Sequence, residues 1–382
     1  MARLRIPNDT AAAVTRGHPW VFRDRPYKAP PGALVELTDD NDRLVGWGLA
    51  DDGPIAVRVL GKGPAPKEPF ANWLEAHLLR CDRFRHRIIF GDTDAYRVVA
   101  GEGDGLSGLV IDRYAKLAVV RLYSSAWTPW LDTIVRALNT AGWAETVFRR
   151  LGVARVDGRD GGETLFGPEP AEKVVVSEHG MKMLVRPYIG QKTGLFLDQR
   201  EHRAMVRQWA NGRTVANLFA YNGGFSVSAV LGGASRVVTV DLAPEAIADA
   251  KENFQINGIN PDDHGFEVAD VFEWRGGKTP FELMIVDPPS LAHDKNAEAA
   301  ARRAYRRLHA QVGPMVARDG LLATSSCTAR LGLDPWRQIV AEGLSASGDW
   351  SWHWISAEPP DHPTALAHPE GRYLKFALLR RR

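Results

Sequence analysis

The segment 214–242, TVANLFAYNGGFSVSAVLGGASRVVTVDL, constrains the fold of this chain more than any other stretch. It combines an apolar strand, a glycine-containing turn, a helix of small residues and a second apolar strand that ends on Asp241. Glycines such as Gly223 let the backbone of the turn approach a ligand closely, because they have no Cβ. The acid that closes the second strand is suited to accept hydrogen bonds from both ribose hydroxyls. The segment therefore predicts a strand–helix–strand unit that holds a nucleoside.

Two phosphate-binding patterns are absent from this segment. It has no G-x-G-x-x-G, the turn that cradles the pyrophosphate of a dinucleotide. It also has no G-x-x-x-x-G-K-[ST], which excludes a P-loop. A nucleoside carrier without a pyrophosphate points to S-adenosylmethionine.

Length, composition and cysteine count restrict the class of protein. A chain of 382 residues is expected to form two or three domains, and 45% hydrophobic with 25% charged residues is typical of a globular protein. The net charge of +2 means that any nucleic-acid surface must be a local patch. Two cysteines, Cys81 and Cys327, exclude a disulfide scaffold and a Cys-rich zinc site, so no metal is expected. The start of the sequence, MARLRIPNDT, has no apolar h-region, and no run approaches about 20 apolar residues, so a cytoplasmic protein without membrane partners is expected.

The pattern of strands and turns predicts three regions. The Gly- and Pro-rich residues 61–70 form the best linker. Before this linker, strands are expected at residues 33–37, 44–49 and 55–60, as in a small β-rich binding module. After it, an α+β region is expected, with helices at 73–90 and 130–141 and strands at 96–100, 108–112, 117–123, 146–150 and 173–178.

From about residue 190 the sequence alternates regularly between apolar strands and helices, which is typical of a parallel sheet covered on both faces. Strands are expected at residues 214–220, 237–241, 266–269, 283–287 and 321–325, and closing strands at 350–357 and 373–379. Helices are expected at residues 224–231, 244–257 and 297–317. Ligands of such sheets bind outside the carboxyl ends of the strands.

Polar residues stand at the carboxyl ends of the predicted strands, whose other residues are mainly apolar. They are Asn217, Tyr221, Asp241, Asp270, Asp287 and Cys327. Asp270 is spaced to meet the adenine amino group, although an acid at a strand end can equally cap a turn or helix. Two prolines, Pro288 and Pro289, fix a rigid turn after Asp287 and hold its carboxylate as an acceptor for a flat base.

Cys327 follows the fifth strand in the sequence TSSCT. A lone cysteine is usually a small buried hydrophobe, but this one lies at a strand end beside Asp287. A thiolate that adds to carbon 6 of a pyrimidine makes carbon 5 nucleophilic enough to take a methyl group. Asp287 would stabilise or protonate the base as charge develops. The target base must be single-stranded or flipped out to reach such a site.

The chain resembles the large-subunit rRNA cytosine-C5 methyltransferases of the RlmI type, within the class I S-adenosylmethionine-dependent methyltransferases. The motifs that carry this resemblance span nearly the whole chain: RGHPWVF, GEGDGLSGLVIDRY, GQKTGLFLDQR, NLFAYNGGFS, VDLAPEAI, VDPPS, SSCT and DHP…HPEGRYLK. The resemblance implies an α/β fold with an N-terminal β-rich PUA domain at residues 1–65, a middle α+β domain at 70–186 and a Rossmann-like methyltransferase domain with a mostly parallel seven-stranded sheet at 187–382.

The resemblance also implies roles for individual residues. Asp241 would bind the ribose, Asp270 the adenine, and Asp287 with Pro288 would lie near the methyl group, while Cys327 matches the nucleophile. The methionine end of the cofactor would be lined by Lys192, Thr193, Asp198, Gln199, Asn217, Phe219, Tyr221 and Gly223. Two departures from the family pattern are Asn222, where threonine is usual, and Ser290-Leu291, where a polar residue and phenylalanine are usual. Because Ser290 and Leu291 would flank the target base, this departure bears on which atom is methylated and not on methyl transfer itself.

RNA, most simply large-subunit rRNA, is the expected partner, and a homodimer is one open arrangement. Two basic clusters are candidates for phosphate contacts, unless each is only a solvated helix face. One comprises Arg302, Arg303, Arg306 and Arg307, and the other comprises Arg80, Arg83, Arg85, His86 and Arg87.

Two other functions stay open at this point. One is N- or O-methylation of RNA or of a small molecule without a covalent intermediate, which Ser290 disfavours because amino-group methyltransferases usually stack an aromatic residue there. The other is an RNA-assembly factor that binds the cofactor without turnover.

Overall fold

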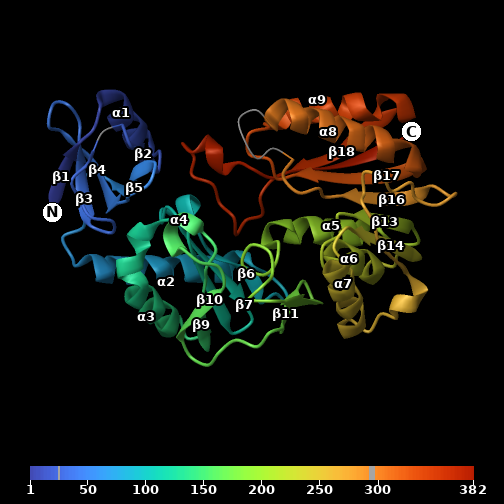
Figure 1. Ribbon diagram of the computed structural model, residues 1–382, viewed down its shortest axis with the longest axis horizontal. Helices are drawn as coiled ribbons and strands as arrows, with labels where there is room; N and C mark the ends of the chain where they lie inside the picture. Colours follow the sequence, from blue (N-terminus) through green and yellow to red (C-terminus); the bar gives the residue numbers. More distant parts are fainter. Residues whose placement is uncertain (25, 292–296) are drawn as a thin grey trace. The chain divides into compact units, whose positions relative to one another are not determined.

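The computed structural model describes residues 1–24, 26–291 and 297–382. The chain divides into two compact units, whose elements are labelled in Figure 1. The first unit comprises residues 1–177, 185–197 and 360–371, and the second comprises residues 178–184, 198–359 and 372–382. The regions predicted at 1–65 and 70–186 thus belong mainly to the first unit. Two segments of the region predicted at 187–382, residues 187–197 and 360–371, also belong to it.

The N-terminal part of the first unit is a five-stranded sheet with the order β1-β3-β4-β5-β2. The strands predicted before the linker are confirmed as β3, β4 and β5, whereas β1, β2 and α1 were not predicted. The elements are β1 (Ala2–Arg5), α1 (Asn8–Arg16), β2 (Trp20–Phe22), β3 (Leu34–Thr38), β4 (Leu44–Ala50) and β5 (Ile55–Lys62). The inward side chains of the strands and of α1, such as Val14, Leu37 and Val57, form one core.

The rest of the first unit is built around a second five-stranded sheet with the order β10-β9-β8-β7-β6. Its strands are β6 (Ala95–Ala100), β7 (Leu109–Tyr114), β8 (Leu117–Leu122), β9 (Thr146–Arg150) and β10 (Gly162–Phe166). Its helices are α2 (Phe70–Ile88), α3 (Leu131–Ala141) and α4 (Ala154–Asp157). Leu74, Leu78 and Cys81 of α2 pack into this core around the fully buried Trp127. The boundary of the first unit falls within β11 (Val174–Glu178) and β12 (Met181–Val185).

The second unit contains a seven-stranded sheet with the order β15-β14-β13-β16-β17-β19-β18, which confirms the predicted Rossmann-like domain. The first five strands in this order, β15, β14, β13, β16 and β17, pair in parallel, and β19 is antiparallel to its two neighbours, β17 and β18. The strands are β13 (Thr214–Leu218), β14 (Arg236–Asp241), β15 (Gly265–Val268), β16 (Phe281–Val286), β17 (Val316–Ser326), β18 (Trp350–Ser356) and β19 (Lys375–Arg381). The strand order reverses between β13 and β16, and such switch points are where open α/β sheets bind ligands.

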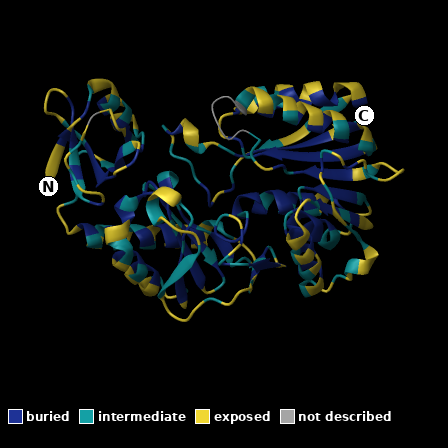
Figure 2. Ribbon diagram, viewed as in Figure 1, coloured by how far each residue is buried: buried dark blue, intermediate teal, exposed yellow. Residues whose placement is uncertain are grey.

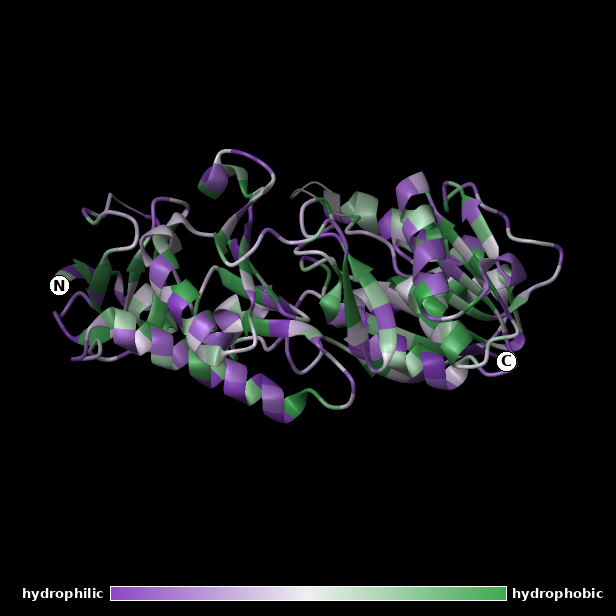
Figure 3. Cartoon of the chain, turned by 90° about the horizontal axis from the view of Figure 1, so that it is seen from below, coloured by the Kyte–Doolittle hydropathy of each residue, from purple (hydrophilic) through white to green (hydrophobic). Residues whose placement is uncertain are grey.

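The two faces of this sheet bury alternate residues of the same strands. Ala216, Met284 and Leu322 pack toward α8 and α9, whereas Val215, Leu283 and Leu321 pack toward α5 and α6. Figure 1 shows α8 and α9 on one side of the sheet and α5, α6 and α7 on the other. The strands are accordingly buried (Figure 2) and hydrophobic (Figure 3), and the outer faces of the helices are exposed and largely hydrophilic. The helices are α5 (Arg200–Trp209), α6 (Gly224–Leu231), α7 (Pro244–Ile256), α8 (Ala297–Val312) and α9 (Leu333–Leu344).

Most predicted elements of this unit are confirmed, and α6 has the predicted bounds. The helix predicted to reach residue 317 ends at Val312, because Gly313 and Pro314 terminate α8, and β17 begins at Val316. Helix α5 was not predicted, because Arg200 and Arg203 share its buried face with Met205 and Val206 and interrupt the apolar pattern. Helix α9 was not predicted either.

Short 3-10 helices connect several of these elements. They are η1 (Gly101–Asp104), η2 (Ser125–Trp130), η3 (Leu197–Gln199), η4 (Pro261–Asp263), η5 (Gly313–Met315), η6 (Ser345–Ser347) and η7 (Pro369–Gly371). Among the residues that the structure describes, no helix combines the length and the apolar character that a membrane crossing requires.

Candidate functional site

The turn after β13 holds two non-glycine residues in a left-handed backbone conformation. Phe219 has φ 57° and Tyr221 has φ 48°, and Gly223 follows with φ 76°. Non-glycine residues rarely adopt positive φ, and such strained positions cluster at ligand sites. A Cβ on Gly223 would lie 2.8 Å from the Cβ of Ala250 on α7, so only glycine fits at this position. The turn thus has the form that the sequence predicts for close approach of backbone to a ligand.

Asp241 at the end of β14 is held by two backbone donors. Its Oδ2 accepts a hydrogen bond from the Tyr221 N–H at 2.8 Å, and its Oδ1 accepts one from the Ala243 N–H at 3.0 Å. Next to it, Leu242 is 68% exposed, and Val268, the strand partner of Asp241, is 53% exposed. A fixed carboxylate beside exposed apolar side chains fits the ribose and the flat base of a nucleoside.

The other strand-end residues that the sequence singled out have local roles in the fold. Asp270 is exposed, and its Oδ1 accepts a hydrogen bond from the Phe272 N–H at 2.9 Å, which caps the turn after β15. Asn217 is fully buried and donates to the Ser226 hydroxyl at 2.9 Å, which also accepts from Thr239 at 2.8 Å. Asn217 therefore ties the turn to α6 and β14 from beneath. Direct contacts of Asp270 and Asn217 with a cofactor stay predictions.

Asp287 lies at the end of β16, next to the end of β17. Its Oδ1 accepts a hydrogen bond from Gln199 Nε2 at 2.9 Å and another from the Ser325 hydroxyl. Val286 and Thr324 are partners in the parallel pairing of the two strands, so Ser325 comes directly beside Asp287. Pro288 is buried, as expected for a rigid turn at this point. The structure thus brings together Gln199 and Asp287, which lie 88 residues apart in the sequence.

A buried histidine fixes the orientation of Gln199. His202 Nδ1 lies 2.5 Å from Gln199 Oε1, and His202 Nε2 lies 2.8 Å from the hydroxyl of Ser356 on β18. Burial lowers the pKa of His202 to about 3, so the imidazole is neutral at physiological pH. Because Gln199 donates from its amide nitrogen to Asp287, its oxygen accepts, and the His202 proton is therefore on Nδ1. This chain of contacts turns the Gln199 amide toward Asp287.

Cys327 is the half-buried residue between two buried hydroxyl residues, Ser326 and Thr328. The phenol of Tyr305 on α8 donates to the Ser326 hydroxyl at 2.9 Å and lies 3.1 Å from that of Thr328. The Thr328 N–H donates to the Ser326 hydroxyl at 3.3 Å. This hydroxyl cluster fixes the backbone on both sides of the thiol.

Lys375 on β19 adds a buried positive charge beside Cys327. Its Nζ donates to the Thr328 carbonyl at 2.6 Å and to the Tyr373 carbonyl at 2.9 Å. Burial lowers the pKa of Lys375 to about 8, while the nearby Cys327 and Glu358 act in the opposite direction. An adjacent cation stabilises a thiolate, the reactive form of cysteine. The sequence reasoning gave Lys375 no role, because its only signal was its place in the motif HPEGRYLK.

Asp198 is buried and accepts a hydrogen bond from the Tyr373 hydroxyl at 2.6 Å. Asp198 is the first residue of segment 198–359 of the second unit, and only Gln199 lies between it and the start of α5. Asp198, Gln199, Asp287 and Cys327 thus belong to the same unit as the turn after β13. Tyr373, Ser325 and His202 complete their surroundings and were not predicted, since only the folded sheet brings their segments together.

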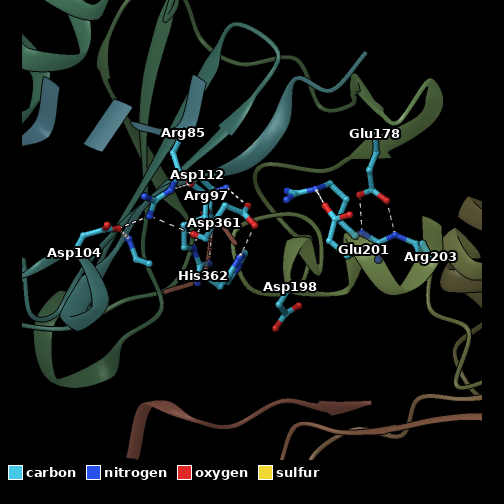
Figure 4. A network of polar contacts seen from close by, with 12 residues as sticks. Arg85, Arg97, Asp104, Asp112, Glu178, Asp198, Glu201, Arg203, Asp361 and His362 are labelled. Atoms are coloured by element: carbon cyan, nitrogen blue, oxygen red, sulfur yellow. Dashed lines mark hydrogen bonds and ion pairs between the residues drawn. The ribbon is translucent and has the colours of Figure 1, made fainter. Parts of the chain in front are cut away.

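The other two predicted cofactor residues, Lys192 and Thr193, belong to the first unit. The Thr193 hydroxyl donates to Asp112 Oδ2 at 2.5 Å and lies 2.9 Å from the Tyr114 hydroxyl. Asp112 in turn forms a two-point ion pair with Arg97, as Figure 4 shows. The side chain of Thr193 is therefore engaged within the first unit, and cofactor contacts of Lys192 and Thr193 stay predictions.

Residues 360–371, the middle of the loop between β18 and β19, also belong to the first unit. Asp361 is fully buried; its Oδ2 accepts a hydrogen bond from the Arg97 N–H at 2.9 Å, and its carbonyl accepts one from Arg85 at 3.3 Å. Arg85 also pairs with Asp104 at 2.5 Å (Figure 4). The DHP motif thus ties this loop to β6 and α2 within the first unit, a role that the sequence analysis did not predict.

The two predicted basic clusters differ in the structure. On α8, three arginines lie within ion-pair distance of acidic side chains, which favours the interpretation as a solvated helix face. These pairs are Arg302–Glu298 at 3.0 Å, Arg306–Glu342 at 3.8 Å and Arg307–Glu273 at 3.2 Å. On α2, the inclusion of Arg85 in a surface patch was wrong, because Arg85 is fully buried in its ion pair with Asp104.

A buried histidine on α8 gives the second unit a defined sensitivity to acid. His309 is fully buried, with Nδ1 2.7 Å from the Tyr305 carbonyl and Nε2 3.0 Å from the Thr324 hydroxyl. Burial lowers the pKa of His309 from 6.5 to about 4. As the pH falls, the unfolded chain takes up this proton first, so the stabilisation is intact above pH 6.5 and is lost between pH 6.5 and 4.

We therefore expect the free energy of unfolding of the second unit to fall by on the order of 3 kcal/mol through His309 over this pH range. His309→Gln keeps a donor and an acceptor but does not titrate, so its urea-unfolding midpoint is expected to depend less on pH. His353→Gln, on the exposed face of β18, is the matched control and should keep the pH dependence of the unsubstituted protein. An unchanged pH dependence in His309→Gln would contradict the assignment.

Comparison with known proteins agrees with this geometry. Residues 104–360 match the family of S-adenosylmethionine-dependent methyltransferases, and residues 4–62 match a PUA-like domain. A ribosomal RNA large subunit methyltransferase of Deinococcus radiodurans is 36% identical, and the alignment covers 99% of this chain and 97% of that protein. The ribosomal RNA large subunit methyltransferase I of Escherichia coli strain K12 is 31% identical, with 98% of each chain covered.

Solved structures share the fold over the whole chain. A methyltransferase from Streptococcus mutans has a TM-score of 0.85 at 24% identity and covers 100% of both chains. A methyltransferase complexed with SAH has a TM-score of 0.87, also at 24% identity and with 100% of both chains covered. With the family match over residues 104–360 and relatives more than 30% identical over nearly the full length, this chain belongs to the S-adenosylmethionine-dependent methyltransferases with an N-terminal PUA-like domain.

Proposed function

We propose that this methyltransferase acts on large-subunit rRNA and forms 5-methylcytosine through a covalent adduct with Cys327. The RNA substrate is supported by the names of the curated relatives, which are ribosomal RNA large subunit methyltransferases. The observation that carries the covalent step is the arrangement of Cys327 and Asp287. The two residues end neighbouring strands, and the Ser325 hydroxyl, two residues before Cys327, donates to Asp287.

Residues of the second unit are suited to hold the cofactor. Asp241 would accept hydrogen bonds from the ribose hydroxyls, and Asp270 would meet the adenine amino group. Asp198 and Gln199, with Phe219, Tyr221 and Gly223 of the turn, would line the methionine moiety. The turn after β13 supports this assignment, because several of its residues have positive φ and because Gly223 packs against Ala250 too closely for a side chain at position 223. When bound, S-adenosylmethionine supplies an electrophilic methyl group on its sulfonium sulfur.

The chain's own residues would activate the acceptor base. The Cys327 thiolate forms a bond to carbon 6 of the cytosine, which makes carbon 5 nucleophilic. Asp287 stabilises or protonates the ring as negative charge develops on it. Carbon 5 would then take the methyl group, whose bond to the sulfonium sulfur breaks and leaves S-adenosylhomocysteine. Carbon 5 would lose its proton to solvent, and the bond between carbon 6 and Cys327 Sγ would break to return the thiolate. The cation of Lys375 and the hydroxyl cluster around Cys327 suit a residue that must twice exist as a thiolate.

The identity of the target nucleotide can be tested directly. We would digest rRNA from a strain that lacks the gene and from its parent, and compare modified nucleosides by mass spectrometry. The expected result is a 5-methylcytosine that is missing in the deletion strain and restored by the purified enzyme. Loss of a methyl group from another atom would favour direct N- or O-transfer. Against that alternative, Ser290 follows the two prolines in place of an aromatic residue, and its hydroxyl lies 3.4 Å from that of Thr328.

The ribose assignment predicts a defined loss of cofactor affinity. Asp241→Ala removes a carboxylate that would accept charge-assisted hydrogen bonds, so binding of S-adenosylmethionine is expected to weaken by about 1–3 kcal/mol. Isothermal titration calorimetry measures this loss. Asp249→Ala, on α7 of the same unit, is a suitable comparison with an acid outside the predicted site. Unchanged affinity in Asp241→Ala would remove this residue from the ribose site.

A further inference from the structure

The outer face of α2 carries a stripe that the described mechanism does not use. Arg80, Arg83, Phe84 and Arg87 are spaced i, i+3, i+4 and i+7, so they lie on one side of the helix, and all four are exposed. The opposite side of α2 is buried in the core of the first unit. Phe90 follows the helix end and is 72% exposed. These five residues are called the outer stripe.

The positive charge of the outer stripe is not balanced as it is on α8. In the described parts of the chain, Arg80, Arg83 and Arg87 form no ion pair with an acidic residue, and an Nη atom of Arg80 lies 2.9 Å from His77 Nδ1. The acid nearest in sequence, Asp82, is buried and accepts a hydrogen bond from the Trp143 indole at 2.9 Å. The outer stripe therefore presents three cationic side chains to solvent.

Aromatic side chains interrupt this basic surface. Phe84 is 51% exposed and Phe90 is 72% exposed. Arginines in the last turns of a helix have an ordinary explanation, because cations stabilise the negative end of the helix dipole. That explanation does not account for exposed phenylalanines among them, whose burial in the core would be favourable. Phosphate-binding cations interleaved with aromatic rings are instead the chemistry by which proteins hold unpaired nucleic acid.

We propose that the outer stripe binds a single-stranded segment of RNA, with the arginines on phosphates and the phenylalanines stacked on bases. This inference rests on the proposed function, since it names how the RNA substrate is held. A duplex would satisfy the arginines but would offer no unstacked base to Phe84 and Phe90. The occupant is therefore single-stranded RNA and not a paired stem.

Binding of two labelled RNAs to the full-length protein tests this proposal. The probes are a single-stranded oligocytidylate of about 12 nucleotides and a fully paired RNA hairpin with a stem of similar length. Affinity is measured over a range of salt concentrations. For a single strand, each phosphate contact contributes about 0.7 to the slope of log affinity against log salt, so Arg83→Gln with Arg87→Gln should reduce the slope by about 1.4. Phe84→Ala should weaken binding roughly 5- to 150-fold and leave the slope unchanged.

The matched control is the double substitution Arg306→Gln and Arg307→Gln on α8, where both arginines are paired with acids. It should change neither slope nor affinity. The proposal is overturned if the stripe variants bind the single strand like the unsubstituted protein, if the α8 control loses as much slope, or if the hairpin is affected equally. It is also overturned if the stripe variants change only the oligomeric state in sedimentation, because the face would then contact a second copy.

The outcome is separable from that of the proposed function. Methyl transfer to rRNA is measured on the same preparations, with saturating S-adenosylmethionine. If the stripe variants bound RNA normally and the protein methylated rRNA, the RNA-binding role of the outer stripe would be refuted and the proposed function would stand. If the stripe variants selectively lost single-strand binding but the unsubstituted protein methylated no rRNA, the RNA-binding surface would stand and the proposed function would fail.

Discussion

Replacing Cys327 with alanine is expected to lower methyl transfer to RNA by roughly 10³-fold or more, while the affinity for S-adenosylmethionine stays close to that of the unsubstituted protein. The reason is that carbon 5 of cytosine is a poor nucleophile until a thiolate has added to carbon 6. Cys327 is half-buried in the hydroxyl cluster and is not among the residues predicted to hold the cofactor. Transfer of a radiolabelled methyl group measures the rate, and calorimetry measures the affinity.

The second cysteine of the chain supplies the matched control. Cys81 is buried on α2, and burial raises the pKa of its thiol to about 12, so it is not a thiolate at neutral pH. Cys81→Ala is expected to keep full transfer activity. An RNA that carries 5-fluorocytidine at the target should also form a stable adduct with the unsubstituted protein but not with Cys327→Ala. Full activity of Cys327→Ala would refute the covalent mechanism and favour direct transfer.

Much of the fold follows from local sequence patterns. The strands of the parallel sheet are continuous apolar runs, and the helix 224–231 was predicted with its observed bounds, because a pair of glycines marks each of its ends. Helix α5 escaped prediction for a physical reason. Its buried Arg203 forms a two-point ion pair with Glu178, at 2.7 and 2.6 Å (Figure 4). Because this arginine stands on the buried face, the apolar Met205 and Val206 do not continue into an apolar stripe along the helix.

The candidate site was predictable at its strand ends and not beyond them. Asp241 is the last residue of β14, and Asp287 and Cys327 directly follow β16 and β17. The carboxyl ends of parallel strands meet at one edge of the sheet, so these residues come together there whatever the conformation of the loops. The partners of these residues come from distant segments: His202 from α5, Ser356 from β18 and Tyr373 from the approach to β19. Only the folded sheet brings these segments together, so no local pattern marks them. Likewise, Arg85 is one of four arginines within eight residues, and only burial separates it from the others.

Asp287→Asn is expected to reduce methyl transfer by roughly 10²- to 10³-fold, the range for losing a group that supports proton transfer or developing charge in the transition state. Asparagine keeps the shape of the side chain but cannot donate or hold a proton for the base. Because Gln199 and Ser325 both donate to Oδ1 of Asp287, an asparagine oxygen can replace that acceptor, and the fold should be preserved. Single-turnover kinetics at saturating S-adenosylmethionine isolate this step from cofactor binding.

Graded variants separate the charge of Asp287 from its placement. Ser325→Ala removes one donor and leaves the carboxylate, so its loss of rate should be smaller than that of Asp287→Asn. Asp334→Asn, 90% exposed on α9, changes the net charge by the same amount and should leave the rate unaltered. If Asp287→Asn kept the full rate, the carboxylate would not serve the base. If Ser325→Ala were as slow as Asp287→Asn, orientation rather than charge would limit transfer, because the ionised group alone would not be enough.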